Sequence, residues 1–437
     1  MNTPKRWSKF LKIIASVVLI AGAHQAIAQD DAKNEGEVST TLTPATKNAI
    51  FDNNAKYTFE VKNTTAIDQS GKVSYVVTRY GKTLHKDSVK VTIKKNSSGK
   101  YTFDLPAMKT GFYKINFMVN VTEYDDTTRR VFGIRPEEIV SQYKKPADFD
   151  KFWADTKADL AKVKPNFKVT LMPKLKTANR NVYLIEMQSY ENMTIRGWMT
   201  VPISKTKRKF SVLLGLPGYQ VNLKPITGMD EDLAIITLNV RGQGNSRGPI
   251  NTRRDEFIFY HIDNRDRYVM RGVIMDCLRA VDFIFTQPNL RHDNIMLTGG
   301  SLGGYLVLAT AALDNRVNLA SVQNPILCDV GNLDGEVTWP INDIKRYIKT
   351  QPGLTYEQVL ENMRYYDGKN FASEIKCSTL MGIGLLDQYA PPANEYATYN
   401  GITAKKRLEV FKDLGHEVSQ AYKDLEGRWM RDAFALF

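Results

Sequence analysis

The chain has 437 residues and a formal charge of +13, and 43% of its residues are hydrophobic. This length is enough for two or three domains with large cores. The basic residues are spread along the chain without a dense tract, so we expect no nucleic-acid partner. Cys277, Cys328 and Cys377 are odd in number and widely spaced, which excludes a disulfide framework or a cysteine metal site.

Residues 1–28 are typical of a secretory signal peptide. Four basic residues, the last of them Lys12, precede an apolar run over residues 13–23, and small residues suit cleavage after Ala28. The apolar run is too short to span a bilayer. We therefore expect export to the periplasm or the extracellular space, with no stable membrane insertion after cleavage; an uncleaved anchor is the alternative. Few cysteines and no disulfides favour a bacterial periplasm.

Residues 29–136 have the pattern of an antiparallel β-sandwich. Apolar residues alternate with polar ones over residues 57–62, 89–93 and 113–121, and short turn sequences separate these runs. Period-two strands with no helical stretch predict an immunoglobulin-like sandwich. No cluster of chemically active residues stands out in it, so we interpret it as an accessory domain that packs or lies against carbohydrate.

The pattern changes from residue 137 to residue 437, where strand-like and helix-like runs alternate. Such alternation predicts a doubly wound, mostly parallel sheet covered by helices on both faces. Residues 335–376 interrupt the alternation with helical, polar sequence, which we interpret as an excursion near the site. Strands are expected at 211–216, 234–240, 294–298, 319–323, 379–385 and 408–411, and helices at 149–163, 267–287, 302–313 and near 422–434.

The segment Gly299-Gly300-Ser301-Leu302-Gly303 fits the pattern G-x-S-x-G between an expected strand and an expected helix. Glycines two residues before and after the serine allow a sharp turn that exposes the hydroxyl. The serine then lies at a helix N-terminus, where amides and the helix dipole favour a developing negative charge. This context predicts a nucleophile; a plain glycine turn is the alternative.

A nucleophilic serine needs a base and a carboxylate that orients it. His416 follows the last expected strand and would stand at the same sheet edge as Ser301. In this architecture the acid comes between them in the chain. Asp387 ends an apolar strand in "LMGIGLLDQYAPP" and is preferred, with Asp329 and Asp334 as rivals.

The oxyanion that forms during ester cleavage needs two backbone donors. One is expected from the residue after the nucleophile, Leu302. The other is expected from the loop after the strand in "LLGLPGYQV", where Tyr219 is the candidate. An ordinary turn at Pro217-Gly218 is the alternative.

Several separated motifs after residue 137 resemble the acetyl xylan esterase/cephalosporin-C deacetylase family of α/β-hydrolases. They are "ADFDKFW", "RGQGNSRG", "YVMRGVIMDCLRAVDF", "TGGSLGG", "GLLDQYAPP" and "GHE". The resemblance implies Ser301, Asp387 and His416 as the catalytic triad. It implies the amides of Tyr219 and Leu302 as oxyanion donors. It also implies a homo-oligomer, whose form the added sandwich leaves open.

The same resemblance implies that "RGQG" braces the site. Arg241 and Gln243 are then supporting residues, and Arg241 is expected to pair with Glu417 beside the base; a surface charge in a turn is the alternative. The sequence departs from the family where Pro217 replaces a common histidine and Leu302 a common glutamine. Backbone donors survive both changes, but the shape of the pocket is left open.

These features predict an exported serine esterase that removes acetyl groups from carbohydrate, with no metal or organic cofactor. Two alternatives belong to the same fold: a serine peptidase and an esterase for other acyl groups. The β-rich region of about 105 residues is too short for the propeller found in some peptidases of this layout. A noncatalytic carbohydrate-binding protein is the alternative outside the enzymes, and it would not need the three triad residues.

Overall fold

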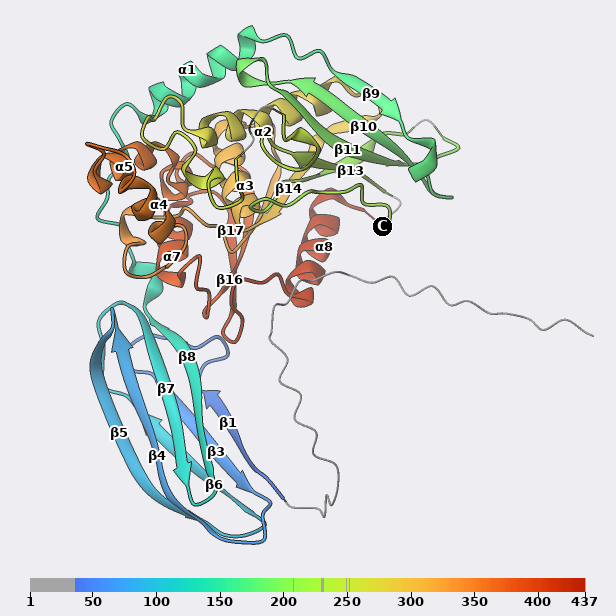
Figure 1. Cartoon of the computed structure of the whole chain (residues 1–437). Helices are drawn as coiled ribbons and strands as arrows, with labels where there is room; N and C mark the ends of the chain where they lie inside the picture. The colour runs from blue at the N-terminus through green and yellow to red at the C-terminus, as the bar shows by residue number, and fades with distance from the viewer. Residues whose placement is uncertain (1–35, 207, 229–231, 249, 251, 437) are drawn as a thin grey trace, which may run out of the picture.

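The computed structural model describes residues 36–206, 208–228, 232–248, 250 and 252–436. The signal peptide expected at residues 1–28 lies outside these residues. Two parts follow each other along the described chain: a β-sandwich, and a larger region in which helices cover a long sheet (Figure 1).

The β-sandwich consists of a three-stranded sheet in the order β1-β3-β6 and a five-stranded sheet in the order β2-β8-β7-β4-β5. Its inward positions carry large apolar side chains, and the rings of Tyr57 and Phe117 lie 5.1 Å apart between the two sheets. The alternation along β7, with every second residue buried, confirms the period-two reading. The strands are β1 (Val38–Pro44), β2 (Ile50–Phe51), β3 (Lys56–Asn63), β4 (Gln69–Arg79), β5 (Lys82–Ile93), β6 (Ser97–Asp104), β7 (Gly111–Val121) and β8 (Tyr124–Ile134).

A nine-stranded sheet forms the second part, in the order β17-β16-β15-β14-β12-β13-β11-β10-β9. The six strands from β13 to β17 in this order run parallel, and β11, β10 and β9 continue the sheet antiparallel. The strands are β9 (Lys168–Leu171), β10 (Arg180–Gln188), β11 (Thr194–Pro202), β12 (Phe210–Gly215), β13 (Leu233–Asn239), β14 (Leu290–Gly300), β15 (Leu319–Gln323), β16 (Ser378–Gly384) and β17 (Lys406–Phe411).

Helices bury both faces of this sheet (Figure 1). Successive residues of β12 show the two faces: Leu213 packs in a cluster with Met430 of α8, whereas Leu214 belongs to the larger core on the other side. A parallel sheet that is covered by helices on both sides is apolar on both faces, as observed here. The helices are α1 (Phe149–Lys162), α2 (Val269–Thr286), α3 (Leu302–Leu313), α4 (Ile341–Ile348), α5 (Tyr356–Met363), α6 (Gly368–Ala372), α7 (Pro392–Gly401) and α8 (Gln420–Phe434).

The doubly wound fold expected from the sequence is therefore confirmed, and so is the sandwich before it. The predicted helix at 302–313 and strand at 319–323 match the observed bounds. The three antiparallel strands β9, β10 and β11 were not predicted. None of the helices in the described part of the chain has the length and apolar character needed to cross a bilayer.

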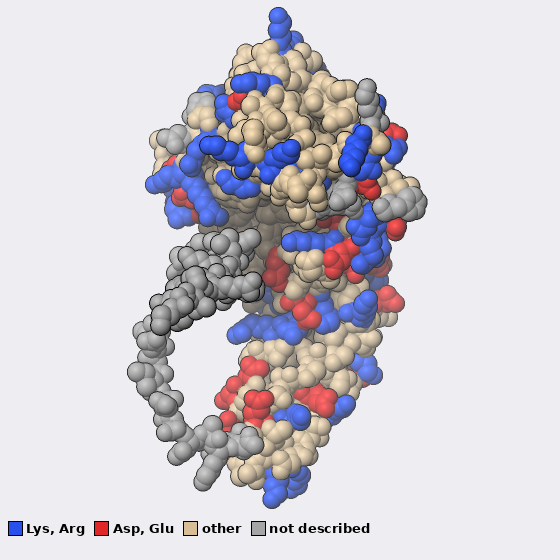
Figure 2. All heavy atoms as spheres, turned by 90° about the vertical axis from the view of Figure 1, so that its right-hand side faces the viewer, with Lys and Arg blue, Asp and Glu red and all other residues tan. Residues whose placement is uncertain are grey.

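On the face shown in Figure 2, basic side chains predominate on the larger part, whereas acidic and basic side chains mix at the waist and on the sandwich. Cys277 and Cys328 are buried and Cys377 is half-buried, and all three are free thiols.

Candidate active site

Ser301 occupies a tight turn between β14 and α3. Its backbone has φ 60° and ψ −123°, a conformation that residues with a side chain rarely adopt. Such strain costs on the order of 1–3 kcal/mol and persists only where the surroundings impose it. Here the amide of Ser301 donates to the carbonyl of Gln323 at 2.9 Å, and the carbonyl of Ser301 accepts from Tyr305 at 3.1 Å. The fold therefore holds the serine rigidly in the exposed turn.

Glycine is required on both sides of this turn by close packing. A Cβ on Gly299 would lie 2.5 Å from the backbone of Gly303, and a Cβ on Gly303 would lie 2.5 Å from the carbonyl oxygen of Leu216. Neither contact is compatible with a side chain. The glycines of G-x-S-x-G thus let the end of β14, the start of α3 and the turn after β12 meet around Ser301.

Ser301, His416 and Asp387 form a continuous chain of hydrogen bonds. The Oγ of Ser301 lies 2.8 Å from Nε2 of His416, and Nδ1 of His416 lies 2.7 Å from Oδ2 of Asp387. A carboxylate only accepts hydrogen bonds, so Nδ1 carries the proton and Nε2 offers its lone pair to the serine hydroxyl. This geometry can transfer the serine proton to the imidazole.

The second oxygen of Asp387 is fixed as well. Oδ1 accepts from the amides of Tyr389 and Ala390, both at 2.8 Å, and the side chain is fully buried. The rival acids lie elsewhere: Asp334 pairs with Lys345 at 2.6 Å, and Asp329 binds Ser141. The structure therefore places Asp387, and neither rival, on the imidazole.

The turn expected to supply an oxyanion donor packs directly against the serine turn. A Cβ on Gly218 would lie 3.6 Å from the carbonyl oxygen of Gly300. The Tyr219 hydroxyl accepts from the amide of Ile258 at 3.1 Å and donates to the carbonyl of Arg254, so its ring is anchored away from the turn. Leu302 is the first residue of α3, where a helix leaves its amide without an intrahelical acceptor.

The predicted ion pair between Arg241 and Glu417 is wrong. Arg241 is buried against α2, where its Nε and Nη2 atoms donate to the two carboxylate oxygens of Asp276 at 2.9 and 2.8 Å. Burial alone would lower the pKa of Arg241, but the Asp276 carboxylate raises it above its ordinary value. Asp276 is itself fully buried and needs this cation. The carboxylate on the apolar face of "VIMDCLRA" was the sequence signal for this pair.

The other two residues expected to support the site have different surroundings. Gln243 is buried, but neither end of its amide has a hydrogen-bond partner among the described residues. The side chain of Glu417 is exposed, and its carbonyl accepts from Nδ2 of Asn324 at 3.0 Å. Asn324 thereby ties the segment after His416 to the end of β15. Glu417 therefore supports this segment through its backbone carbonyl and not through its side chain.

Two aromatic side chains that were not singled out from the sequence lie near the histidine, one beside it and one beyond. The ring of Tyr389 lies 5.1 Å from that of His416 and is 44% exposed. Trp339 lies 6.1 Å from Tyr389 and 4.9 Å from Tyr219. In the sequence, only its position two residues after Asp387 indicated that Tyr389 lies near the site. Trp339 comes from the predicted excursion at 335–376.

A buried carboxyl group on α7 also lies near the acid. Glu395 is fully buried, and neither of its carboxyl oxygens has a hydrogen-bond partner within the described residues. Burial raises the pKa of Glu395 well above its usual value, and the charge of Asp387 raises it further. At a given pH Glu395 is therefore less ionised than an ordinary glutamate and opposes the charge of Asp387 less.

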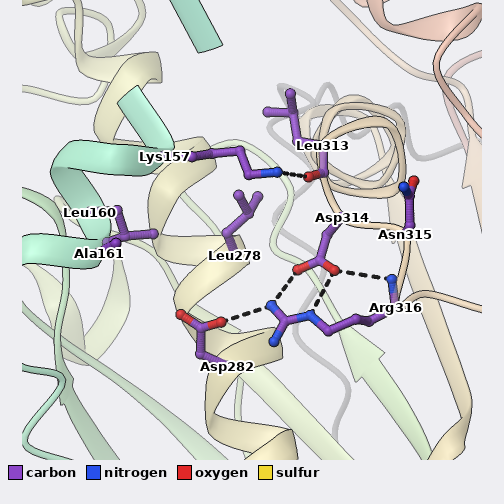
Figure 3. Close-up of a pocket in the computed structure, with 9 residues that line it drawn as sticks. All are labelled: Lys157, Leu160, Ala161, Leu278, Asp282, Leu313, Asp314, Asn315 and Arg316. Carbon is purple, nitrogen blue, oxygen red and sulfur yellow. Dashed lines mark hydrogen bonds and ion pairs between the residues drawn. The ribbon is translucent and has the colours of Figure 1, made fainter. Parts of the chain in front are cut away.

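The hollow drawn in Figure 3, of about 330 Å³, lies away from this site. It is lined by residues of α1, α2 and the far end of α3, about 18 Å along the helix from Ser301. Its charged groups already have partners: Arg316 reaches both Asp282 and Asp314, and Lys157 donates to the carbonyl of Leu313. We assign it no part in the chemistry.

The long mostly parallel sheet, the strained serine turn and the Ser301–His416–Asp387 chain define the class of protein as an α/β-hydrolase. Two solved structures share the fold. One is acetyl xylan esterase 1 from Thermoanaerobacterium sp. JW/SL YS485 (TM-score 0.62, 26% identity, 69% of this chain and 98% of that one). The other is an acetyl xylan esterase from Paenibacillus sp. R4 (TM-score 0.61, 27% identity, 68% and 98%).

Within that class the chain belongs to the acetyl xylan esterase family, whose model matches residues 137–433. It is also 29% identical over 334 residues to the acetyl esterase Axe7A of Xylanibacter ruminicola, covering 73% of each chain. The protein is thus a carboxylic-ester hydrolase of this family.

Proposed function

We propose that the protein is an exported serine esterase that removes acetyl groups from acetylated carbohydrate through an acyl-enzyme. The observation that carries the proposal is the hydrogen-bond chain from Ser301 through His416 to Asp387, in a chain of the acetyl xylan esterase family. Export rests on the sequence of residues 1–28 alone.

In the proposed acylation step, Nε2 of His416 takes the proton from Oγ of Ser301 as Oγ attacks the carbonyl carbon of the ester. The amides of Tyr219 and Leu302 stabilise the oxyanion of the tetrahedral intermediate. The imidazolium, stabilised by Asp387, then gives its proton to the departing sugar oxygen. An acetyl group is left on Ser301 and the free alcohol leaves.

Deacylation repeats the same steps with water. His416 takes a proton from a water molecule, the resulting hydroxide attacks the acetyl carbonyl, and a second tetrahedral intermediate forms against the same amides. Its collapse releases acetate, and the proton returns to Oγ of Ser301. Every proton transfer uses a group of this chain.

The surroundings of Ser301 support a small acyl group. Val418 is 38% exposed and lies 3.2 Å from the position of a Cβ on Gly300, and Val221 is 43% exposed beside Gly218. Both side chains are apolar and lie beside glycines of the turns that meet at Ser301, so they are proposed to border the acyl site. Each methylene that does not fit such a site costs about 1–3 kcal/mol of transition-state binding.

The alcohol side of the substrate is proposed to lie against Tyr389 and Trp339. The C–H faces of sugar rings are apolar and pack well on aromatic rings. Tyr389 is the more exposed of the two and lies beside His416, where the leaving sugar oxygen must receive its proton. This position favours a carbohydrate alcohol over a simple one.

A series of p-nitrophenyl esters from acetyl to hexanoyl tests the acyl preference. We expect kcat/KM for butyryl to be at least about tenfold below that for acetyl. A butyryl or hexanoyl optimum would remove the deacetylase assignment. Turnover of a peptide p-nitroanilide in preference to acetyl esters would support the serine peptidase instead, and no turnover of any ester would support the noncatalytic alternative.

A further inference from the structure

The β-sandwich touches the loop that carries His416. This loop, residues 412–418, joins β17 to α8, and Asp413 in it pairs with Arg130 of β8, Nε to Oδ1, at 3.0 Å. Burial raises the pKa of the Tyr57 hydroxyl, on which Arg130 and Asp413 also act. The ion pair is therefore close enough to the buried Tyr57 hydroxyl to affect its pKa. It joins two parts of the chain that are far apart in sequence.

Other contacts hold the same loop from the opposite side. The amide of Leu386, next to Asp387, donates to the carbonyl of Leu414 at 2.9 Å. Asn324 holds the carbonyl of Glu417 at 3.0 Å. The histidine loop is thus bound on one side by the sandwich and on the other by segments at the ends of β15 and β16.

A second sandwich contact reaches α7, which follows the Asp387 loop. The ring of Phe112 on β7 lies 5.3 Å from that of Tyr396, and Nδ2 of Asn400 donates to the carbonyl of Pro136 at 2.9 Å. The sandwich therefore contacts both the loop that carries the base and the helix that follows the acid. Figure 1 shows it at this end of the sheet, below α7 and β16.

We propose that the β-sandwich braces the histidine loop, with Arg130 as a positioning residue that acts on His416 through Asp413. The inference rests on the proposed role of His416 as the base. Lys412 also pairs with Asp413, but it belongs to the same loop and cannot tether that loop to the sandwich. Arg130 is the partner of Asp413 that belongs to the sandwich.

Arg130→Met and Arg130→Lys test this proposal as a matched pair, because both keep a long apolar stem and only lysine keeps the charge. A half-exposed ion pair adds little to global stability, whereas a misplaced catalytic group is costly. We expect Arg130→Met to lower kcat for p-nitrophenyl acetate about three- to tenfold with KM and Tm nearly unchanged. Arg130→Lys should keep kcat within about twofold of the wild type.

Charge reversal gives a second test. Arg130→Glu and Asp413→Arg should each lower kcat more than Arg130→Met, because like charges then face each other. The double variant restores opposite charges and should recover most of the lost kcat. Lys94→Ala is the control: it breaks an ion pair of 2.8 Å with Asp68 inside the sandwich, and Lys94 is 72% exposed. It should leave kcat unchanged.

Equal kcat for Arg130→Met, Arg130→Lys and the wild type would overturn the bracing role. The same holds for a double charge reversal that recovers nothing. Ser301→Ala, assayed alongside, separates the two proposals. If Ser301→Ala is inactive and the Arg130 variants behave like the wild type, only the bracing role fails. If Ser301→Ala stays active, the proposed function itself fails.

Discussion

Asp387 orients the histidine through one short hydrogen bond and is itself held by two backbone amides. Asp387→Asn would place an amide where the imidazole needs an acceptor and favour the wrong tautomer. We expect kcat/KM for p-nitrophenyl acetate to fall about 10³- to 10⁴-fold. Circular dichroism should show an unchanged fold.

The matched control for this change is Asp334→Asn. Asp334 pairs with Lys345 on the surface of α4 and does not touch the imidazole. We expect its effect on kcat/KM to stay within about twofold, because exposed ion pairs contribute little. Similar losses in both variants would mean that the wrong acid has been assigned.

Single residues were predictable from the sequence where a motif fixed their surroundings. Ser301 came from its glycines, and His416 and Asp387 came from their positions after expected strands. The partner of Arg241 was not predictable in this way, because it depends on which helix packs against the segment that follows β13 and on which carboxylate that helix carries there. Asp276 stands out in the sequence as a carboxylate on the apolar face of a predicted helix, but nothing there shows that its partner is Arg241.

Elements were predictable where both faces of the sheet are buried. β12, β13 and β15 are buried along almost their whole length, and α3 begins directly after the serine turn. The short strand β9 has only exposed residues, and β10 mixes buried and half-buried ones, so their sequences carry a weak signal. β10 is placed by its pairing with β11, and β9, at the edge of the sheet, is placed by its pairing with β10.

The buried carboxyl of α7 gives a prediction at the scale of this element. Burial raises the pKa of Glu395 in the folded protein, so the stability it contributes is present below the unfolded pKa, about 4.3, and is lost as the pH rises. A glutamine side chain at the same position would not titrate. We expect Glu395→Gln to gain stability over the wild type as the pH increases from about 5 to about 9, measured by urea unfolding.

The control is Glu357→Gln on α5, where the side chain is exposed. It should change stability by the same small amount at every pH. A difference between Glu395→Gln and the wild type that does not vary with pH would show that the Glu395 carboxyl is ionised to the same extent in the folded and unfolded chains.

At the scale of the whole molecule, the succession of a sandwich and a doubly wound sheet follows from the change of period near residue 136. How the two parts meet does not follow from the sequence. Arg130 and Asp413 are ordinary charged residues in their own segments, and only the fold brings them within 3.0 Å. Contacts of this kind depend on the relative placement of two cores, which local pattern does not encode.

The most direct test of the whole account is the rate of acetate release from acetylated xylo-oligosaccharides by the wild type and by Ser301→Ala. We predict measurable release by the wild type and a loss of about 10³- to 10⁶-fold in the variant at unchanged Tm. A folded Ser301→Ala protein that keeps more than about a tenth of the wild-type rate would contradict the account, because the ester would then be cleaved without the serine.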